Sequence, residues 1–310
     1  MKQALFIAGP TASGKSALSL RLAKDLNGVI INADSMQVYD GLRIVTACPS
    51  EVDEASAPHR LYRFLDPAET CSAAFWAERA MAEIEAAWAN GQTPIVIGGT
   101  GMYFKVLLEG IAKIPAIDPS IRAEVRRACD EAGSEPLHAE LAVYDPVTAE
   151  RLPVGDSQRI CRAVEVFRST GKTLSDWHKE NAPGLMQAAD EAGQVVKLVM
   201  DIDRDALYER CDRRFDCMLE EGALEEVRNF MSYQLDPDLP SMRALGVPSL
   251  IAVISGEQEE AEAIEDAKMQ TRRFAKRQLT WFRNQFSDWE RISAQLSESD
   301  YRKLLSKNIK

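Results

Sequence analysis

The octapeptide at residues 9 to 16 constrains the fold of this chain more than any other feature. It reads Gly-Pro-Thr-Ala-Ser-Gly-Lys-Ser and matches the pattern G-x-x-x-x-G-K-[ST] in full. An apolar run at residues 3 to 8 precedes it, and apolar residues with helical spacing follow it from 16 to 26. A strand, this loop and a helix in succession predict a phosphate-binding loop at the end of a buried strand.

The residues of this loop have defined physical roles in holding a diphosphate. Glycines let the backbone turn so that successive N–H groups face the anion, and the helix N-terminus adds its positive end. Lys15 would neutralise phosphate oxygens, and the Ser16 hydroxyl would bind Mg²⁺. The expected diphosphate-binding residues are Gly9, Pro10, Thr11, Ala12, Ser13, Gly14, Lys15 and Ser16. The motif leaves open which bond is broken.

Further apolar runs predict strands at residues 28 to 33, 94 to 97 and 194 to 200. An alanine-rich helix is expected at residues 75 to 90, with Gly91 as its stop. Strands that alternate with helices at this spacing are typical of a parallel sheet covered on both faces. We therefore expect an α/β fold, a P-loop NTPase-like parallel sheet covered by helices.

The character of the sequence changes past about Pro115. Residues 116 to 190 are polar, have a helical pattern and contain no convincing strand, and the pattern is helical again from residue 204 to the end. We interpret residues 1–115 and 193–310 as a P-loop core and residues 116–192 as a helical insertion domain. A chain of 310 residues is long enough for both.

Composition narrows the class of protein. No run of about 20 apolar residues occurs, so we expect no membrane span and a cytoplasmic protein. The six cysteines form no Cys-x-x-Cys pair and the three histidines lie far apart, which predicts free thiols and no zinc site. No apolar stripe stands out, so a monomer is expected. The net charge of −11 argues against nucleic acid, although a local basic face can still bind RNA.

Two more loops are expected beside the phosphate-binding loop. Residues 34 to 37 follow the strand predicted at 28 to 33, and residues 98 to 101 (Gly-Gly-Thr-Gly) follow the strand at 94 to 97. Ligands bind at the carboxyl ends of parallel strands, so the three loops should converge. Asp34 is a candidate general base, or else a turn residue that bonds local N–H groups. The glycine stretch either belongs to the site or is a tight turn.

With these loops the chain resembles the tRNA dimethylallyltransferase family, the bacterial type of tRNA isopentenyltransferase, over nearly its whole length. A glycine-rich loop alone is generic, but a set of motifs in this order is specific. The motifs are residues 9 to 16, Asp34-Ser-Met-Gln-Val-Tyr39, Gly98-Gly-Thr-Gly-Met-Tyr-Phe104, Asp156-Ser-Gln-Arg159 with Arg162, Arg214-Phe215 through Gly222, and Thr271-Arg-Arg-Phe-Ala-Lys-Arg-Gln-Leu-Thr-Trp-Phe-Arg283.

The resemblance implies transfer of a dimethylallyl group from dimethylallyl diphosphate to N6 of the adenosine 3′-adjacent to the anticodon of tRNA. Asp34 would accept a proton from the weakly nucleophilic exocyclic amine. The positions that match the family's catalytic diphosphate ligands are Thr11, Lys15, Ser16 with Mg²⁺, and Arg214. From the residues alone, the favoured interpretation is that Arg214, with Arg210 and Arg213, belongs to the solvated face of a helix.

The resemblance also implies contacts with the tRNA anticodon stem-loop, whose target base would be flipped out of its stack. The implied RNA-binding residues are Asp34, Ser35, Met36, Gln37, Thr100, Arg122, Gln158, Arg159, Ile160, Cys161, Arg162, Arg243, Gly246, Lys276, Arg277, Gln278 and Arg283. The insertion at 116–192 would help clamp the stem-loop, or else it is a packing appendage. Residues 271 to 283 are basic without an acid, which suits a phosphate backbone or a dipole-matched surface helix.

Three stretches depart from the usual family pattern. Val45 and Cys48 stand where glycine and lysine are usual, and residues 59 to 63 (His-Arg-Leu-Tyr-Arg) replace His-His-Leu and a small acidic segment. Residues 247 to 249 (Val-Pro-Ser) replace Tyr-Arg-Gln. None of these touches the loop or Asp34, so they bear on tRNA preference and not on the chemistry.

Three other functions use the same loop. A small-molecule or nucleotide kinase would break a P–O bond of ATP, but it leaves the basic stretch and the insertion unexplained. A P-loop protein that binds RNA without chemistry gives Asp34 no role. An adenylate isopentenyltransferase acting on free AMP would share the donor and mechanism, and the RNA-clamping segments argue against it.

Overall fold

The computed structural model describes residues 2 to 308, which fall into two compact units. The first unit contains the residues up to Leu108 and those from Leu185 onward, and the second is Glu109–Gly184. The second unit overlaps the insertion expected at 116 to 192. The two ranges differ at their ends because residues 110 to 118 and 181 to 184 form neither helix nor strand, so no periodic pattern marks the change.

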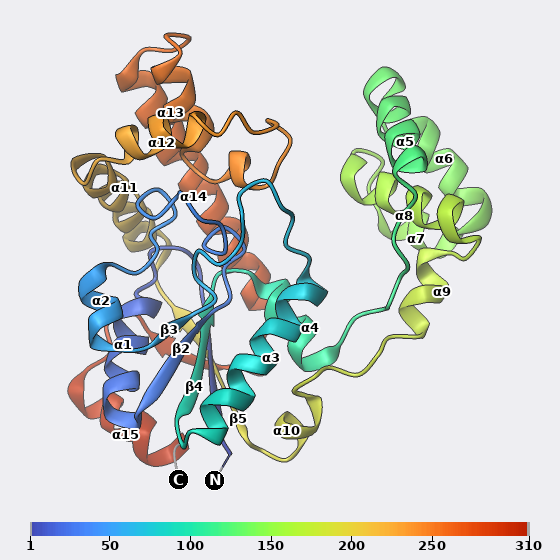
Figure 1. The fold of residues 1–310 in the computed structure, drawn as a ribbon. Coiled ribbons are helices and arrows are strands. Elements are labelled where there is room, and N and C mark those ends of the chain that lie inside the picture. Colours follow the sequence, from blue (N-terminus) through green and yellow to red (C-terminus); the bar gives the residue numbers. More distant parts are fainter. Residues whose placement is uncertain (1, 309–310) are drawn as a thin grey trace. The chain divides into compact units, whose positions relative to one another are not determined.

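The first unit is built on a six-stranded parallel sheet with the strand order β3-β2-β4-β1-β5-β6 (Figure 1). The strands are β1 (Ala4–Ala8), β2 (Gly28–Asn32), β3 (His59–Arg60), β4 (Thr93–Gly98), β5 (Val195–Asp201) and β6 (Glu290–Ser293). This confirms the predicted fold class. The expectation of continuous helix after residue 204 is wrong at β6, which pairs with the outer edge of β5 and takes its hydrogen bonds there.

Helices account for most of the remaining chain. Those of the first unit are α1 (Lys15–Leu26), α2 (Glu51–Ser56), α3 (Ala73–Ala89), α4 (Gly101–Glu109), α10 (Gln187–Glu191), α11 (Arg204–Glu220), α12 (Ala223–Met231), α13 (Val247–Ile254), α14 (Glu260–Gln285) and α15 (Glu298–Asn308), with a 3₁₀ turn η1 at Ser241–Arg243. None of the helices within residues 2 to 308 combines the length and the apolar character needed to cross a bilayer.

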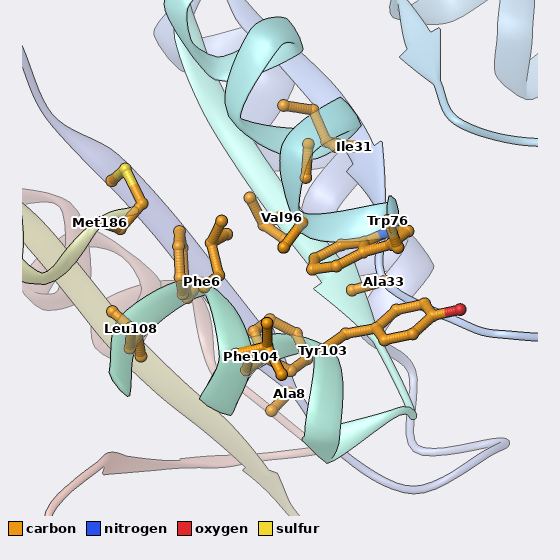
Figure 2. Packing of buried hydrophobic residues seen from close by; sticks show 14 of the residues in the cluster. Phe6, Ala8, Ile31, Ala33, Trp76, Val96, Tyr103, Phe104, Leu108 and Met186 are labelled. Atoms are coloured by element: carbon orange, nitrogen blue, oxygen red, sulfur yellow. The ribbon is translucent and has the colours of Figure 1, made fainter. Parts of the chain in front are cut away.

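Alternate residues of β1 face opposite sides of the sheet, as the period of a strand requires. Phe6 belongs to the cluster formed with Trp76 of α3 and Phe104 of α4, which Figure 2 shows from close by. Its neighbours Leu5 and Ile7 belong to the opposite cluster, which α1 and α15 cover. Both faces of the sheet are therefore buried, which explains why its strands read as continuous apolar runs.

The second unit is all helical and has a core of its own. Its helices are α5 (Pro119–Ala132), α6 (Glu135–Tyr144), α7 (Pro146–Arg151), α8 (Ser157–Thr170) and α9 (Leu174–Lys179). Val125 of α5, Leu141 of α6 and Val164 of α8 meet in this core. Each of α5, α7 and α8 begins at an aspartate whose side chain accepts a hydrogen bond from a backbone N–H of the first turn. These N-caps fix where the three helices start.

The parallel register brings three strand ends to one edge of the sheet. Ala8, the last residue of β1, lies opposite Gly98, the last residue of β4. A Cβ atom on Gly98 would lie 2.0 Å from the carbonyl oxygen of Ala33, which follows β2. The Ala33 N–H donates to the Ile97 carbonyl at 2.6 Å, so the two chains are held at this close approach. The loops after β1, β2 and β4 therefore start from nearly the same place.

Gly98→Ala should lower the free energy of unfolding by about 3 kcal/mol, because the new methyl group overlaps the Ala33 backbone. The matched control is Gly91→Ala, which has φ +66° and no atom within 4 Å of the added Cβ. It should cost only about 1 kcal/mol of backbone strain. Urea unfolding of the two variants measures the difference, and equal losses would contradict the packing argument.

Candidate active site

The loop after β1 has the conformation of an anion cradle. Ala12 has φ +60° and Gly14 has φ +92°, and this left-handed pair turns the chain into α1. The Ser13 N–H bonds to the Pro10 carbonyl at 3.3 Å, while the Ser13 hydroxyl is buried and has no hydrogen-bond partner. The turn is closed without using the N–H groups at the start of α1, which a helix leaves without intrahelical partners and which can therefore bind an anion.

Lys15 is held inside the loop by a bond from its Nζ to the Pro10 carbonyl at 2.7 Å. Burial lowers the pKa of the Lys15 ammonium group to about 8, with the charge of Arg214 acting in the same direction and that of Asp34 opposing it. The cation is thus incompletely compensated in the free protein. A bound polyanion would supply the missing compensation.

Helix α11 brings Arg214 to the loop. Its guanidinium group donates a hydrogen bond to the Thr11 hydroxyl, and burial lowers its pKa. Arg210 and Arg213 line the same cavity from this helix. The alternative in which Arg214 belongs to a solvated face is therefore wrong. Arg210 and Arg213 were not expected at the site, although the spacing of four residues between Arg210 and Arg214 was a usable signal.

Asp34 forms a turn and also lines the cavity. Its Oδ1 accepts the Met36 N–H at 3.0 Å, as in an Asx turn, and its own N–H donates to the Asn32 side chain at 2.8 Å. The same carboxylate lines the cavity that contains the phosphate-binding loop. The turn therefore fixes the direction of the carboxylate without removing it from the site.

The glycine stretch after β4 also belongs to this edge. Gly98 lines the cavity, and Thr100 Oγ1 accepts the Ser35 N–H at 2.9 Å and donates to the Ser35 hydroxyl at 3.2 Å. The loops after β2 and β4 are thereby joined by side-chain and backbone bonds. The glycine stretch is therefore a tight turn that also lines the cavity.

Gln278 of α14 ties two of these loops together. Its Oε1 accepts the Thr11 N–H at 2.8 Å, and its Nε2 donates to the Gly99 carbonyl at 2.9 Å. The side chain is only 7% exposed. The expectation that Gln278 contacts RNA is corrected, because both ends of its amide are already bonded inside the protein.

The loops and α11 enclose a cavity of about 470 Å³. It is lined by Thr11, Ala12, Ser13, Gly14, Lys15, Ser16, Asp34, Gln37, Thr46, Ala47, Ile97, Gly98, Arg210, Arg213, Arg214 and Cys217. Lysine and arginine outnumber carboxylates among these residues, since Asp34 is the sole acid among them. An environment of several cations and backbone N–H groups facing one carboxylate suits an anionic ligand and a base that acts beside it.

Two of the departures from the family pattern are neighbours. Cys48 is buried near the cavity, and burial raises the pKa of its thiol to about 11, an effect that the nearby charge of Arg63 opposes. The Arg63 guanidinium group also pairs with Glu54 at 2.6 Å. A cation is therefore present at this place, supplied from position 63 instead of position 48. The neighbouring Gln37 amide is bonded to the Thr46 and Ala47 carbonyls at 3.0 and 2.8 Å.

The remaining expected RNA contacts of the first unit lie outside the cavity. Lys276 and Arg277 line a surface groove of about 460 Å³ on α14. Arg243 and Arg283 are 61% and 59% exposed. Of two further residues, Met36 is half-buried and Gly246 is buried. Both contact the packed interior around α11 to α13.

In the second unit, the residues of α8 that were expected to contact RNA lie on different faces of the helix. Gln158 and Arg159 are exposed, and Arg162 is half-buried. Ile160 and Cys161 are 0% and 8% exposed and belong to the helical core, so the expectation that their side chains contact RNA is corrected. The resemblance marked a segment of chain, but on an amphipathic helix only part of such a segment reaches solvent.

No group of three or more His, Cys, Asp or Glu side chains in residues 2 to 308 is arranged to hold a metal ion. Ser16 is exposed and lines the cavity beside the loop. This donor set fits Mg²⁺, which is commonly held by one protein oxygen, water and the oxygens of a phosphate ligand. It does not fit a metal held by a dedicated protein cage.

Comparison with protein families gives a match over residues 37–285 to the model described as IPP transferase. A tRNA dimethylallyltransferase of Paramagnetospirillum magneticum is 49% identical over 296 residues, which cover 96% of this chain and 92% of that protein.

Solved structures agree with this match. The tRNA isopentenylpyrophosphate transferase of Bacillus halodurans superposes with a TM-score of 0.67 at 31% identity, covering 99% of this chain and 95% of that one. A eukaryotic dimethylallyltransferase acting on tRNA superposes with a TM-score of 0.80 at 26% identity, covering 99% of this chain and 79% of its own.

The affinity of the cavity for an alkyl diphosphate should fall as pH rises through about 8, the pKa of Lys15. Below this pH the ammonium group is charged before binding. Above it the neutral amine must take up a proton on binding, so affinity should fall by up to about tenfold per pH unit. Calorimetry in buffers of different ionisation enthalpy measures this uptake directly. Lys15→Met should bind weakly with no such dependence, and a flat profile in the unmodified protein would contradict the argument.

Gln278→Glu should weaken alkyl diphosphate binding by about tenfold, a loss in the range of one buried hydrogen bond. A carboxylate can still accept the Thr11 N–H, but it cannot donate to Gly99 and it adds negative charge beside the anion. Gln270→Glu makes the same change at an exposed position of α14 and should leave the affinity unchanged. Titration calorimetry of both variants tests this, and equal affinities would remove Gln278 from the site.

Proposed function

The chain belongs to the IPP transferase family, and from this premise we propose that it transfers a dimethylallyl group from dimethylallyl diphosphate to N6 of the adenosine 3′-adjacent to the anticodon in tRNA. Diphosphate is the second product. One observation carries the proposal: a phosphate-binding loop, a group of cations and the Asp34 carboxylate face the same cavity. This arrangement supports a role for Asp34 as a base beside the cations that would hold the leaving group.

The donor half of the site stabilises the leaving diphosphate. Backbone N–H groups of the loop, Lys15 and Arg214 would bind its oxygens, and Thr11 is oriented by its bond from Arg214. Mg²⁺, bound by Ser16 and by the donor's own oxygens, would add Lewis-acid stabilisation of the charge that develops on the diphosphate. The bond between the allylic carbon and the diphosphate oxygen breaks, and its electron pair goes to that oxygen. The cations would neutralise the charge that results.

The acceptor half of the site removes a proton. The N6 lone pair of adenine is delocalised into the ring, so the amine needs to lose a proton as its bond to the allylic carbon forms. Asp34 is the acid side chain that lines the cavity, and its Asx turn keeps one oxygen bonded to Met36 while the other stays available. The proton therefore passes from N6 to Asp34, and no other co-reactant is required.

The RNA partner is supported by basic residues on exposed surfaces. Lys276 and Arg277 lie with Trp281 along one groove of α14, which offers both phosphate and base-stacking contacts. We place the activity in the cytoplasm, in keeping with the tRNA-modifying relatives. We also propose a monomer, because the large exposed apolar side chains of residues 2 to 308 are scattered over separate elements.

The proposal is tested by following label from dimethylallyl diphosphate into unmodified tRNA in the presence of Mg²⁺. Parallel arms offer free AMP as acceptor and ATP as a phosphoryl donor. Label on the adenosine beside the anticodon is the expected result. Label on AMP alone would point to an adenylate isopentenyltransferase, and ATP turnover without prenyl transfer would point to a kinase.

Asp34→Asn should reduce the transfer rate by about a thousandfold, within the range for loss of a general base. The amide keeps an oxygen for the Met36 N–H, so the turn and the binding of donor and tRNA should persist. Single-turnover assays with saturating substrates measure the rate. Asp40→Asn, an exposed position on the same loop, is the matched control and should transfer normally. Unchanged transfer in Asp34→Asn would reject Asp34 as the base.

A further inference from the structure

Glu165 is a buried carboxylate in the helical second unit. It lies on α8 and is 2% exposed. Its Oε1 is 3.4 Å from Nε of Arg126, and its Oε2 is 4.0 Å from Nε of Arg122. Both arginines lie on α5, which packs against α8 (Figure 1). A buried carboxylate needs such partners, because its charge is poorly stabilised in the interior.

A third arginine shares this carboxylate. Arg162, one turn before Glu165 on α8, is half-buried. Burial lowers the pKa of its guanidinium group, the charge of Glu165 opposes that effect, and the charge of Arg122 adds to it. Arg122, Arg126 and Arg162 thus surround a single acid. The cluster keeps an excess of positive charge although the chain as a whole carries −11.

The donors left free in this cluster face solvent. Glu165 occupies the Nε side of Arg122 and Arg126, whose side chains are 56% and 57% exposed. Across residues 2 to 308, Glu165 is the acid paired with either of them, so their terminal Nη groups are free to bind an anion. These two guanidinium groups are four residues apart on α5 and project from the same side of the helix.

Other arginines of the unit are arranged differently. Arg168 pairs with Glu124 at 2.8 Å and with Glu140 at 2.6 Å, so its charge is fully compensated. Arg159 pairs with Asp156 at 2.8 Å. Around Glu165, by contrast, three arginines of α5 and α8 share one acid, and Arg127 of α5 lies outside this cluster.

We propose that Glu165 is a positioning residue that holds Arg122 and Arg126 as a pair of guanidinium forks for phosphate groups of the RNA backbone. The inference rests on the proposed function, because it takes the tRNA substrate as the ligand. It adds Arg126 to the RNA-binding surface, and it gives Glu165 a role in which it touches no RNA. Arginine suits this task because its planar fork binds phosphate bidentately while Nε bonds elsewhere.

Charge and positioning make opposite predictions for Glu165→Gln. The substitution keeps the shape of the side chain and makes the unit more positive by one charge. If only net charge mattered, RNA would bind more tightly. If Glu165 orients the arginines, RNA binding should weaken because the forks lose their fixed geometry and must be ordered on binding.

The experiment measures binding of a fluorescent anticodon stem-loop RNA to the full chain over a range of salt concentrations. Glu165→Gln and Arg126→Ala should each weaken binding by roughly five- to tenfold. Arg126→Ala should also reduce the slope of log affinity against log salt by about 1, as expected for loss of one phosphate contact. Arg127→Ala is the matched control, since it removes the same charge from the adjacent exposed position of α5 and should change affinity less than twofold.

Transfer kinetics supply the second measurement. Glu165→Gln should raise KM for tRNA and leave kcat and the KM for the donor unchanged, and Glu165→Asp should restore part of the affinity. Arg126 is exposed, so its variant tests the surface even if Glu165→Gln unfolds the unit. Equal or tighter binding by a folded Glu165→Gln protein, or equal losses in Arg126→Ala and Arg127→Ala, would overturn the proposal. Absence of prenyl transfer by the unmodified protein would instead reject the proposed function, while stem-loop binding would still decide the role of Glu165.

Discussion

The close approach of β4 to the end of β2 determines how the site is assembled. There is no room for a Cβ atom at Gly98, because it would lie 2.0 Å from the Ala33 carbonyl oxygen. Asp34 follows Ala33 directly, and Thr100 bonds back to the loop of Ser35. Gln278 then joins this pair of loops to the phosphate-binding loop through its amide. Asp34 and the phosphate-binding loop are therefore held by one connected set of backbone and side-chain contacts.

Uncompensated positive charge is the second organising feature. Lys15 and Arg214 are both destabilised as cations by burial in the free protein. In the proposed function a bound diphosphate would compensate both charges, so part of the binding free energy would be prepared before the ligand arrives. The cluster around Glu165 follows the same logic on a surface. A chain with a net charge of −11 can thus still offer anion-binding surfaces, since cations are concentrated at the two proposed sites.

The errors of the sequence analysis concern the direction of side chains and edge pairing. Ile160, Cys161 and Gln278 lie in segments that resemble RNA-binding motifs, yet each side chain points inward, because one face of an amphipathic helix must be buried. Strand β6 was missed because four residues at the edge of a sheet carry little pattern of their own and depend on β5 for their hydrogen bonds. Arg210 and Arg213 were not expected at the site because the packing of α11 against the phosphate-binding loop is not visible in the sequence.

By itself, the sequence determined the phosphate-binding loop, the main strands of the parallel sheet and the candidacy of Asp34. These features are local. The loop is eight contiguous residues, and the strands are apolar runs that are visible along the chain. Only the tertiary structure decided that Arg214 faces Thr11, that Gln278 joins two loops and that Glu165 gathers arginines from two helices. Those contacts join residues far apart in the sequence, and their geometry depends on how helices pack, which no local pattern encodes.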